Sequence, residues 1–230
     1  MKHIASLTLL AATLYADGPG RIESKYSGKE FPLTADPNAA QWKGVKPVIA
    51  EGDRYGKPVS GHRTEIRSRW TKDHLYFLYV CPYEKLFLKP SPSTATETNK
   101  LWDWDVAEVF IGADFKNINR YREFQVSPQG EWVDLDIDRQ SPSPQAGWKW
   151  NSGFTVKARV DANRKVWYGE MKIPIASVDS RPAKEGTELR INFFRIQGPM
   201  APDRVHVAWQ PPNANSYHTP EAFGRIVLVK

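Results

Sequence analysis

The sequence predicts an all-β fold, an antiparallel β-sandwich of the jelly-roll kind with about ten strands. Two observations lead to this class. The chain has 18 prolines in 230 residues and few long periodic stretches, which favours strands joined by ordered loops over helices. Short apolar or alternating segments also recur along the chain, and turn residues separate them.

The expected strands fall into three hairpins and several single segments. The plainest hairpin joins residues 121–127 to 131–137 through the turn Pro128-Gln129-Gly130. The other two hairpins are expected at residues 64–70 with 74–81, and at 154–160 with 166–173. Further strands are expected at residues 45–50, 106–112, 188–196, 205–209 and 223–229, and a short helical turn at 174–178. Residues 17–42 and 82–100 are expected to be mainly loop, and no internal repeat or second domain is evident.

The first residues are typical of a targeting segment. Lys2 is followed by an apolar run from Ile4 to Tyr15, and polar sequence begins at Asp17. This order predicts a secretory signal peptide over residues 1–16, with a buried N-terminal helix as the alternative. The run is shorter than the roughly 20 residues of a membrane span. We therefore expect one domain over residues 17–230, secreted or periplasmic and without a membrane span.

Charge and cysteine content narrow the function classes. The formal charge is +6, and the basic residues are scattered singly rather than in a dense run, so no nucleic-acid partner is expected. Cys81 is the one cysteine, which excludes an internal disulfide. It ends an apolar run, so a buried structural thiol is expected.

Catalytic and metal-binding signatures are sparse. The sequence has no G-x-S-x-G, P-loop or H-E-x-x-H motif, and its five histidines fall singly. A glycoside hydrolase needs only two carboxylates placed by the fold, so this class stays open. Asp134, Asp136 and Asp138 alternate and would share one face of a strand. Calcium is one way to hold them together, and a solvated strand face with basic neighbours is the other.

Two stretches look unlike ordinary core sequence. Residues 101–108 place Trp102, Trp104 and three carboxylates where a long loop enters a strand. Residues 209–218 place Tyr217 in a loop rich in amides and proline. Flat rings suit the apolar faces of sugars, whereas carboxylates and amides suit their hydroxyl rims. Both stretches therefore favour carbohydrate binding.

The same stretches resemble carbohydrate-binding module family 9. The resemblance runs in order over most of residues 31–230 and is carried by these segments: Trp102-Asp103-x-Asp105-x-x-Glu108-Val109-Phe110-Ile111, Phe124-Gln125-Val126, and Trp209-x-x-Pro212-x-x-Asn215-Ser216-Tyr217-x-x-Pro220-x-x-Phe223-Gly224. It implies a β-sandwich module that grips a sugar between two aromatic rings, here Trp102 and Tyr217. It also implies that Glu108 bonds sugar hydroxyls, and it places Gln125 where the family has an arginine.

The sequence thus predicts a non-catalytic carbohydrate-binding protein that serves polysaccharide breakdown outside the cytoplasm. Glu108, Gln125 and Asn215 are expected to bond the hydroxyls of an oligosaccharide or polysaccharide. For Trp102 the alternative is an aromatic cap on the sandwich, and for Glu108 an ion pair with Arg190 or Arg195. A haem-binding redox domain of similar fold and a glycoside hydrolase are the competing function classes.

Overall fold

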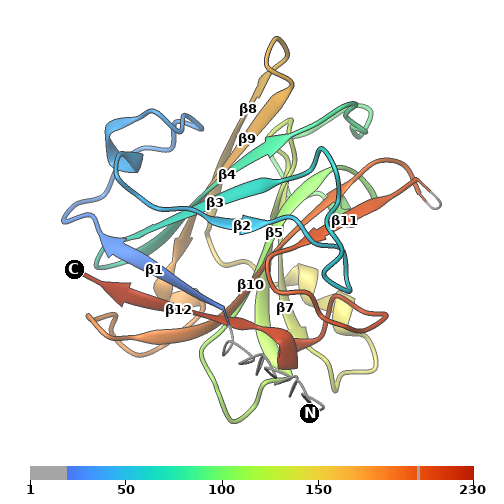
Figure 1. Cartoon of the computed structure of the whole chain (residues 1–230). Helices are drawn as coiled ribbons and strands as arrows, with labels where there is room; N and C mark the ends of the chain where they lie inside the picture. The colour runs from blue at the N-terminus through green and yellow to red at the C-terminus, as the bar shows by residue number, and fades with distance from the viewer. Residues whose placement is uncertain (1–19, 201–202) are drawn as a thin grey trace, which may run out of the picture.

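A computed structural model describes residues 20–200 and 203–230, so the predicted signal peptide lies outside the described residues. In the described part of the chain, twelve strands form one mixed sheet with two layers (Figure 1). The strands are β1 Arg21–Tyr26, β2 Val48–Ala50, β3 Thr64–Trp70, β4 His74–Pro82, β5 Val106–Gly112, β6 Arg120–Val126, β7 Trp132–Asp138, β8 Thr155–Asp161, β9 Val166–Pro174, β10 Glu188–Gln197, β11 Val205–Ala208 and β12 Gly224–Val229.

The first layer has the strand order β7-β6-β5-β10-β12, with β11 paired to β10. The second has the order β1-β3-β4-β9-β8, with β2 paired to β3. Strand β1 links the layers, because it pairs in parallel with β12 and with β3. Figure 1 shows β1 beside β12, near the C-terminus. The other strand pairs are antiparallel, as the sequence predicts.

The main core lies between the two layers. Alternate residues of the central strands point into it, among them Val109 of β5, Phe193 of β10 and Phe77 of β4. Cys81 is also buried there, as predicted, and burial raises the pKa of its thiol to about 12. The layers approach closely at Gly169 of β9, where a Cβ atom would lie 2.8 Å from Cγ1 of Val126. This position therefore requires glycine.

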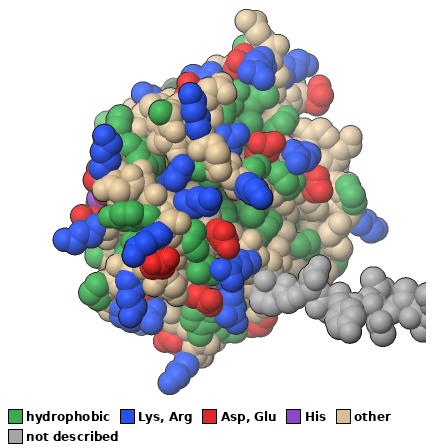
Figure 2. Space-filling model, turned by 60° about the vertical axis from the view of Figure 1, so that its left-hand side comes forward, with side chains coloured by type: hydrophobic (Ala, Val, Ile, Leu, Met, Phe, Trp, Pro, Cys, Tyr) green, Lys and Arg blue, Asp and Glu red, His purple; other side chains and the backbone are tan. Residues whose placement is uncertain are grey.

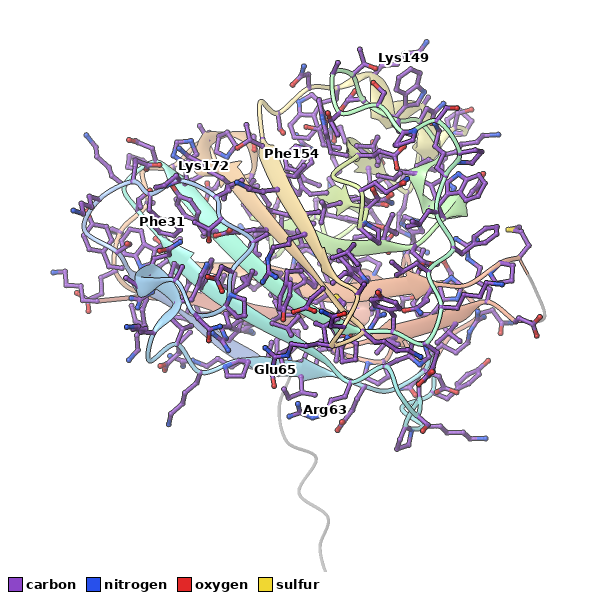
Figure 3. All side chains as sticks on the ribbon, turned by 90° about the horizontal axis from the view of Figure 1, so that it is seen from above. Phe31, Arg63, Glu65, Lys149, Phe154 and Lys172 are labelled. Carbon is purple, nitrogen blue, oxygen red and sulfur yellow. The ribbon has the colours of Figure 1, made fainter. Side chains whose placement is uncertain are left out.

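The outer face of the second layer is covered by the N-terminal segment, residues 27–47. This segment carries the short 3-10 helix η1 Ala40–Trp42, and Trp42 packs on Tyr76 and Leu78 of β4. Phe31 stacks on Tyr76 with ring centroids 3.9 Å apart. Phe31 and Lys172 of β9 lie on this side of the molecule in Figure 3.

The outer face of the first layer is not covered in this way. Phe110 of β5, Tyr121 of β6 and Leu135 of β7 form a second apolar cluster there. Trp102, Trp148 and Tyr217 pack against this cluster from the loops and are partly buried. The candidate site lies on this face.

Candidate functional site

A cavity of about 250 Å³ lies on the outer face of the first layer. Its floor includes Glu108 and Phe110 of β5 and Glu123 of β6. Its walls include Trp102, Asn215 and Tyr217, which come from two loops more than a hundred residues apart in the sequence. The volume is slightly below the roughly 300–1,000 Å³ of pockets that hold drug-sized ligands, so it suits a small molecule or the end of a larger one.

Trp102 lies in a loop that is fixed by a buried neighbour and by hydrogen bonds. It lies in the 3-10 turn η2 Leu101–Asp103, and Leu101 is fully buried beneath it. The carboxylate of Asp105 accepts hydrogen bonds from the backbone N–H of Phe87 at 2.9 Å and of Gly198 at 2.7 Å. Asp105 therefore joins two neighbouring loops to the strand that follows Trp102, and it has a structural part in the site.

Tyr217 is supported by a neighbouring histidine. The imidazole of His206 stacks on the Tyr217 ring with centroids 4.7 Å apart and an angle of 15° between the planes. The ring of Phe194 meets the same tyrosine edge-on at 5.4 Å. Two sides of the phenol ring are thus packed against β10 and β11, which fixes its orientation.

Asn215 is oriented by residues that the sequence analysis did not single out. The hydroxyl of Tyr55 donates to its Oδ1 at 3.0 Å, and the guanidinium of Arg54 donates to its backbone oxygen at 2.8 Å. Because Oδ1 is engaged by Tyr55, the amide Nδ2 is the group of this side chain that can donate to a ligand.

Two buried carboxyl groups lie on adjacent strands at the cavity floor. The amide Nε2 of Gln125 donates to Oε1 of Glu108 at 2.8 Å and to Oε1 of Glu123 at 2.5 Å. Burial raises the pKa of Glu123 to about 7, against the opposing effect of the hydrogen bond from Gln125. Burial, together with the nearby charge of Glu123, also raises the pKa of Glu108. Two such groups at close range favour a shared proton over two negative charges.

The histidines that line the cavity are neutral near pH 7. Burial, together with the charges of Arg204 and Arg54, lowers the pKa of His206 to about 4. Burial likewise lowers the pKa of His218 to about 4, and its Nδ1 lies 2.7 Å from the hydroxyl of Tyr121. Neither imidazole therefore adds positive charge to the cavity.

Four of the five predicted binding residues meet at this cavity: Trp102, Glu108, Asn215 and Tyr217. Gln125 is completely buried and does not line the cavity. Its position behind both carboxyl groups makes it a positioning residue. Glu123 lines the cavity although the sequence analysis passed over it, and the alternation of Glu123 with Gln125 on one strand face is the signal that could have found it.

The alternative ion pairs of Glu108 are not formed. The guanidinium of Arg190 donates to backbone oxygens of residues 114, 118 and 120. The buried guanidinium of Arg195 donates to Thr64, to the backbone oxygen of Pro82 and to Gln197. Arg190 is thus engaged by the backbone of the loop between β5 and β6 and by Arg120 of β6, and Arg195 links the two layers, so Glu108 lines the cavity without either of them.

The three aspartates proposed as calcium ligands share one face of β7, but they have different neighbours. Asp134 is completely buried and accepts from the backbone N–H and the hydroxyl of Ser152. Asp136 forms an ion pair with Arg122, and Arg120 lies 3.8 Å from Asp136 and 4.0 Å from Asp138. Basic neighbours therefore balance Asp136 and Asp138, whereas Asp134 is held by Ser152. Within residues 20–200 and 203–230, no group of three or more His, Cys, Asp or Glu side chains is arranged to hold a metal ion.

An open cavity with aromatic walls and polar groups on its floor, on one face of a β-sandwich, defines a small-ligand-binding module. The family described as "Carbohydrate family 9 binding domain-like" matches residues 38–230, and the chain belongs to this family. The family is one of non-catalytic binding modules. Within the described residues, no helix has the length and apolar character that a membrane crossing requires.

Individual relatives agree with this assignment. The chain is 27% identical over 171 residues to a protein of Arthroderma benhamiae named "Extracellular protein", with 69% of this chain and 70% of that protein covered. Two solved structures of family 9 carbohydrate-binding modules from Caldicellulosiruptor kristjanssonii share its fold. One is in complex with cellotriose, at 16% identity and a TM-score of 0.64, with 91% of this chain and 94% of that chain covered. The other is in complex with glucose, at 17% identity and a TM-score of 0.63, with 91% and 95% covered.

Proposed function

We propose that this protein binds a carbohydrate outside the cytoplasm and has no catalytic activity of its own. A sugar ring would enter the cavity between Trp102 and Tyr217 and serve as the attachment point for polysaccharide breakdown by other proteins. One observation carries the proposal: two aromatic side chains and two hydrogen-bonding side chains, chosen from the sequence, line a single cavity. Family membership and the sugar-bound structural neighbours support it.

The walls and the floor would contribute differently to binding. The two rings provide flat apolar surfaces for the C–H faces of a sugar, and Tyr217 is held in place by His206. The Nδ2 of Asn215 can donate to a hydroxyl, whereas Glu108 can accept from one. Each such hydrogen bond contributes about 1 kcal/mol, so we expect dissociation constants on the order of micromolar to millimolar.

The proposal is tested by a glycan screen followed by calorimetric titration of the wild type and two tryptophan variants. We expect Trp102→Ala to weaken binding about tenfold or more, because it removes one stacking surface. Trp104→Ala is the matched control, since this neighbouring ring stacks on Phe87 at 4.8 Å and does not line the cavity. It should bind as the wild type does.

Three results would count against this function. A folded wild-type protein that binds no glycan would show that the family resemblance conveys the fold alone. Release of reducing ends that disappears in Glu108→Gln would indicate a glycoside hydrolase. A Soret band in the purified protein would indicate the haem-binding alternative.

A further inference from the structure

The charge of the cavity differs from what a neutral sugar requires. Among the described side chains that line it, Glu108 and Glu123 are the two that can carry a formal charge near pH 7, because His206 and His218 are neutral. Both carboxyl groups are at least nine-tenths buried. The Oε2 atom of Glu123 is buried and has no hydrogen-bond partner in the described part of the chain. A buried polar atom in this state is costly unless a ligand satisfies it.

The basic residues near the cavity do not satisfy this pair. The guanidinium of Arg204 is close enough to influence Glu108 electrostatically, but its Nη1 donates to the backbone oxygen of Asp103 at 3.1 Å. The guanidinium of Arg54 donates to the backbone oxygen of Asn215 and lies 5.2 Å from the centre of the Tyr217 ring. Neither arginine forms an ion pair with Glu108 or Glu123 among the described residues.

We propose that the cavity selects a sugar that carries a free amine, and that Glu108 and Glu123 together bind its ammonium group. This inference rests on the proposed carbohydrate-binding function and specifies its ligand class. An ammonium group has three N–H donors, and Glu123, whose side chain lines the cavity, has a buried acceptor without a partner, Oε2. Hydrogen bonds between charged groups are about twice as strong as neutral ones. The ring of Trp102 also favours a cation, because the face of an aromatic ring is electronegative, whereas the ring of Tyr217 already has Arg54 over it.

Gln125 makes this arrangement specific for a cation. Its Nε2 donates to both carboxyl groups and holds them on the same side of the sheet. A basic side chain at this position would neutralise the pair from behind. The uncharged amide orients the two carboxyl groups and leaves their negative charge for the ligand.

Binding of an ammonium group to the carboxyl pair should also change the number of protons bound to the protein, and this change can be measured. The raised pKa values of Glu108 and Glu123 mean that the pair holds a proton near neutral pH. Binding of an ammonium group favours the ionised pair and therefore releases protons. The titratable groups that face the pair are Tyr121, Tyr217, His206, His218 and the more distant Arg204, and none of them takes up a proton near pH 7. Affinity should then rise with pH until the amine of the ligand itself loses its proton.

The experiment is a calorimetric titration near pH 6, where the amines of the sugar are protonated, with three trisaccharides of the same linkage: cellotriose, fully deacetylated chitotriose and tri-N-acetylchitotriose. We expect wild-type protein to bind chitotriose about tenfold to a hundredfold more tightly than cellotriose. The acetylated sugar should show no such gain, because it has no charge. The binding enthalpy of chitotriose should also depend on the ionisation enthalpy of the buffer, which reports proton release and needs no variant.

Glu123→Gln provides the residue-level test, and Glu188→Gln on the exposed side of β10 is its control. The first variant should abolish the preference for chitotriose over cellotriose, measured as the ratio of the two affinities, and the second should keep the wild-type ratio. Equal affinity of the wild type for chitotriose and cellotriose would overturn the inference and leave carbohydrate binding intact. The inference would also be overturned if the wild type bound other glycans but none of the three trisaccharides. A folded protein that binds no glycan would overturn the proposed function itself.

Discussion

At the residue scale, the carboxyl groups at the cavity floor link stability to pH. The folded state holds a proton on Glu123 up to a pKa of about 7, whereas the unfolded chain loses it near the ordinary value of 4.5. Between these two values the folded state binds more protons than the unfolded state. The free energy of unfolding therefore falls as pH rises through this window.

We expect Glu123→Gln to remove this part of the pH dependence, because an amide does not ionise. A raised pKa of this size corresponds to about 3 kcal/mol, so the wild type should lose stability of that order between about pH 5 and about pH 8 relative to the variant. Urea unfolding at the two pH values measures the difference. Glu188→Gln should keep the wild-type slope, since Glu188 is a partly exposed partner of Arg225. An equal slope in Glu123→Gln would show that Glu123 is ionised in the folded protein at pH 5.

Sequence reasoning could find the residues with distinctive chemistry, but not their exact roles. Trp102, Tyr217, Glu108 and Asn215 stood out because their residue types suit a sugar, and they share one cavity. Supporting contacts such as His206 behind Tyr217 could not be found in this way, because they depend on the pairing of β10 with β11. Gln125 illustrates the same limit: its residue type is suitable for binding, and its burial is a consequence of packing.

At the scale of elements, strand patterns were reliable wherever alternation was strong. Strands β3 and β5 have the predicted limits, and the three predicted hairpins are all formed. The prediction was wrong for residues 21–26, which were expected to be loop and form β1. This segment has one apolar side chain facing the core, Ile22, and its stability comes from parallel pairing with two distant strands. Strand β2 is shorter than predicted and begins at Val48, directly after Pro47.

The N-terminal segment, residues 27–47, depends on one buried carboxylate of β9. Glu170 accepts hydrogen bonds from the backbone N–H of Thr34 and of Ala35, each at 2.6 Å, and from Nε1 of Trp42 at 2.9 Å. We expect Glu170→Gln to lower the free energy of unfolding by about 2–3 kcal/mol, because an amide replaces an acceptor that serves three donors. Hydrogen exchange should accelerate over residues 31–45.

A control variant and a control measurement test whether the effect of Glu170→Gln is confined to the N-terminal segment. Glu23→Gln on β1 changes an exposed carboxylate that pairs with Arg21, and it should leave exchange and stability unchanged. Sugar binding should persist in Glu170→Gln, since the segment covers the second layer and the cavity lies on the first. Unchanged exchange over residues 31–45 in Glu170→Gln would mean that the apolar contacts of Trp42 and Phe31 suffice to hold the segment.

At the scale of the whole molecule, the two outer faces of the sandwich differ in whether another segment covers them. The face of β4 and β9 is closed by the N-terminal segment, whereas the face of β5, β6 and β7 is left accessible between loops. Basic side chains are dispersed among acidic and apolar ones over the surface seen in Figure 2, in agreement with their scattered positions in the sequence.

Residues 1–16 predict where the protein acts, because they have the pattern of a secretory signal peptide. We expect export from a secreting host to yield a protein that begins at Asp17, because a basic residue followed by an apolar run, here Lys2 and Ile4 to Tyr15, is the pattern of a signal peptide. N-terminal sequencing and intact mass give the cleavage point, and the formal charge falls from +6 to +5 with the loss of Lys2. Replacing both Leu9 and Leu10 by Arg should block export, since arginine is strongly disfavoured in an apolar segment. If these residues instead form a buried helix, deleting them would lower the melting temperature of the remaining domain, whereas a signal peptide predicts no change.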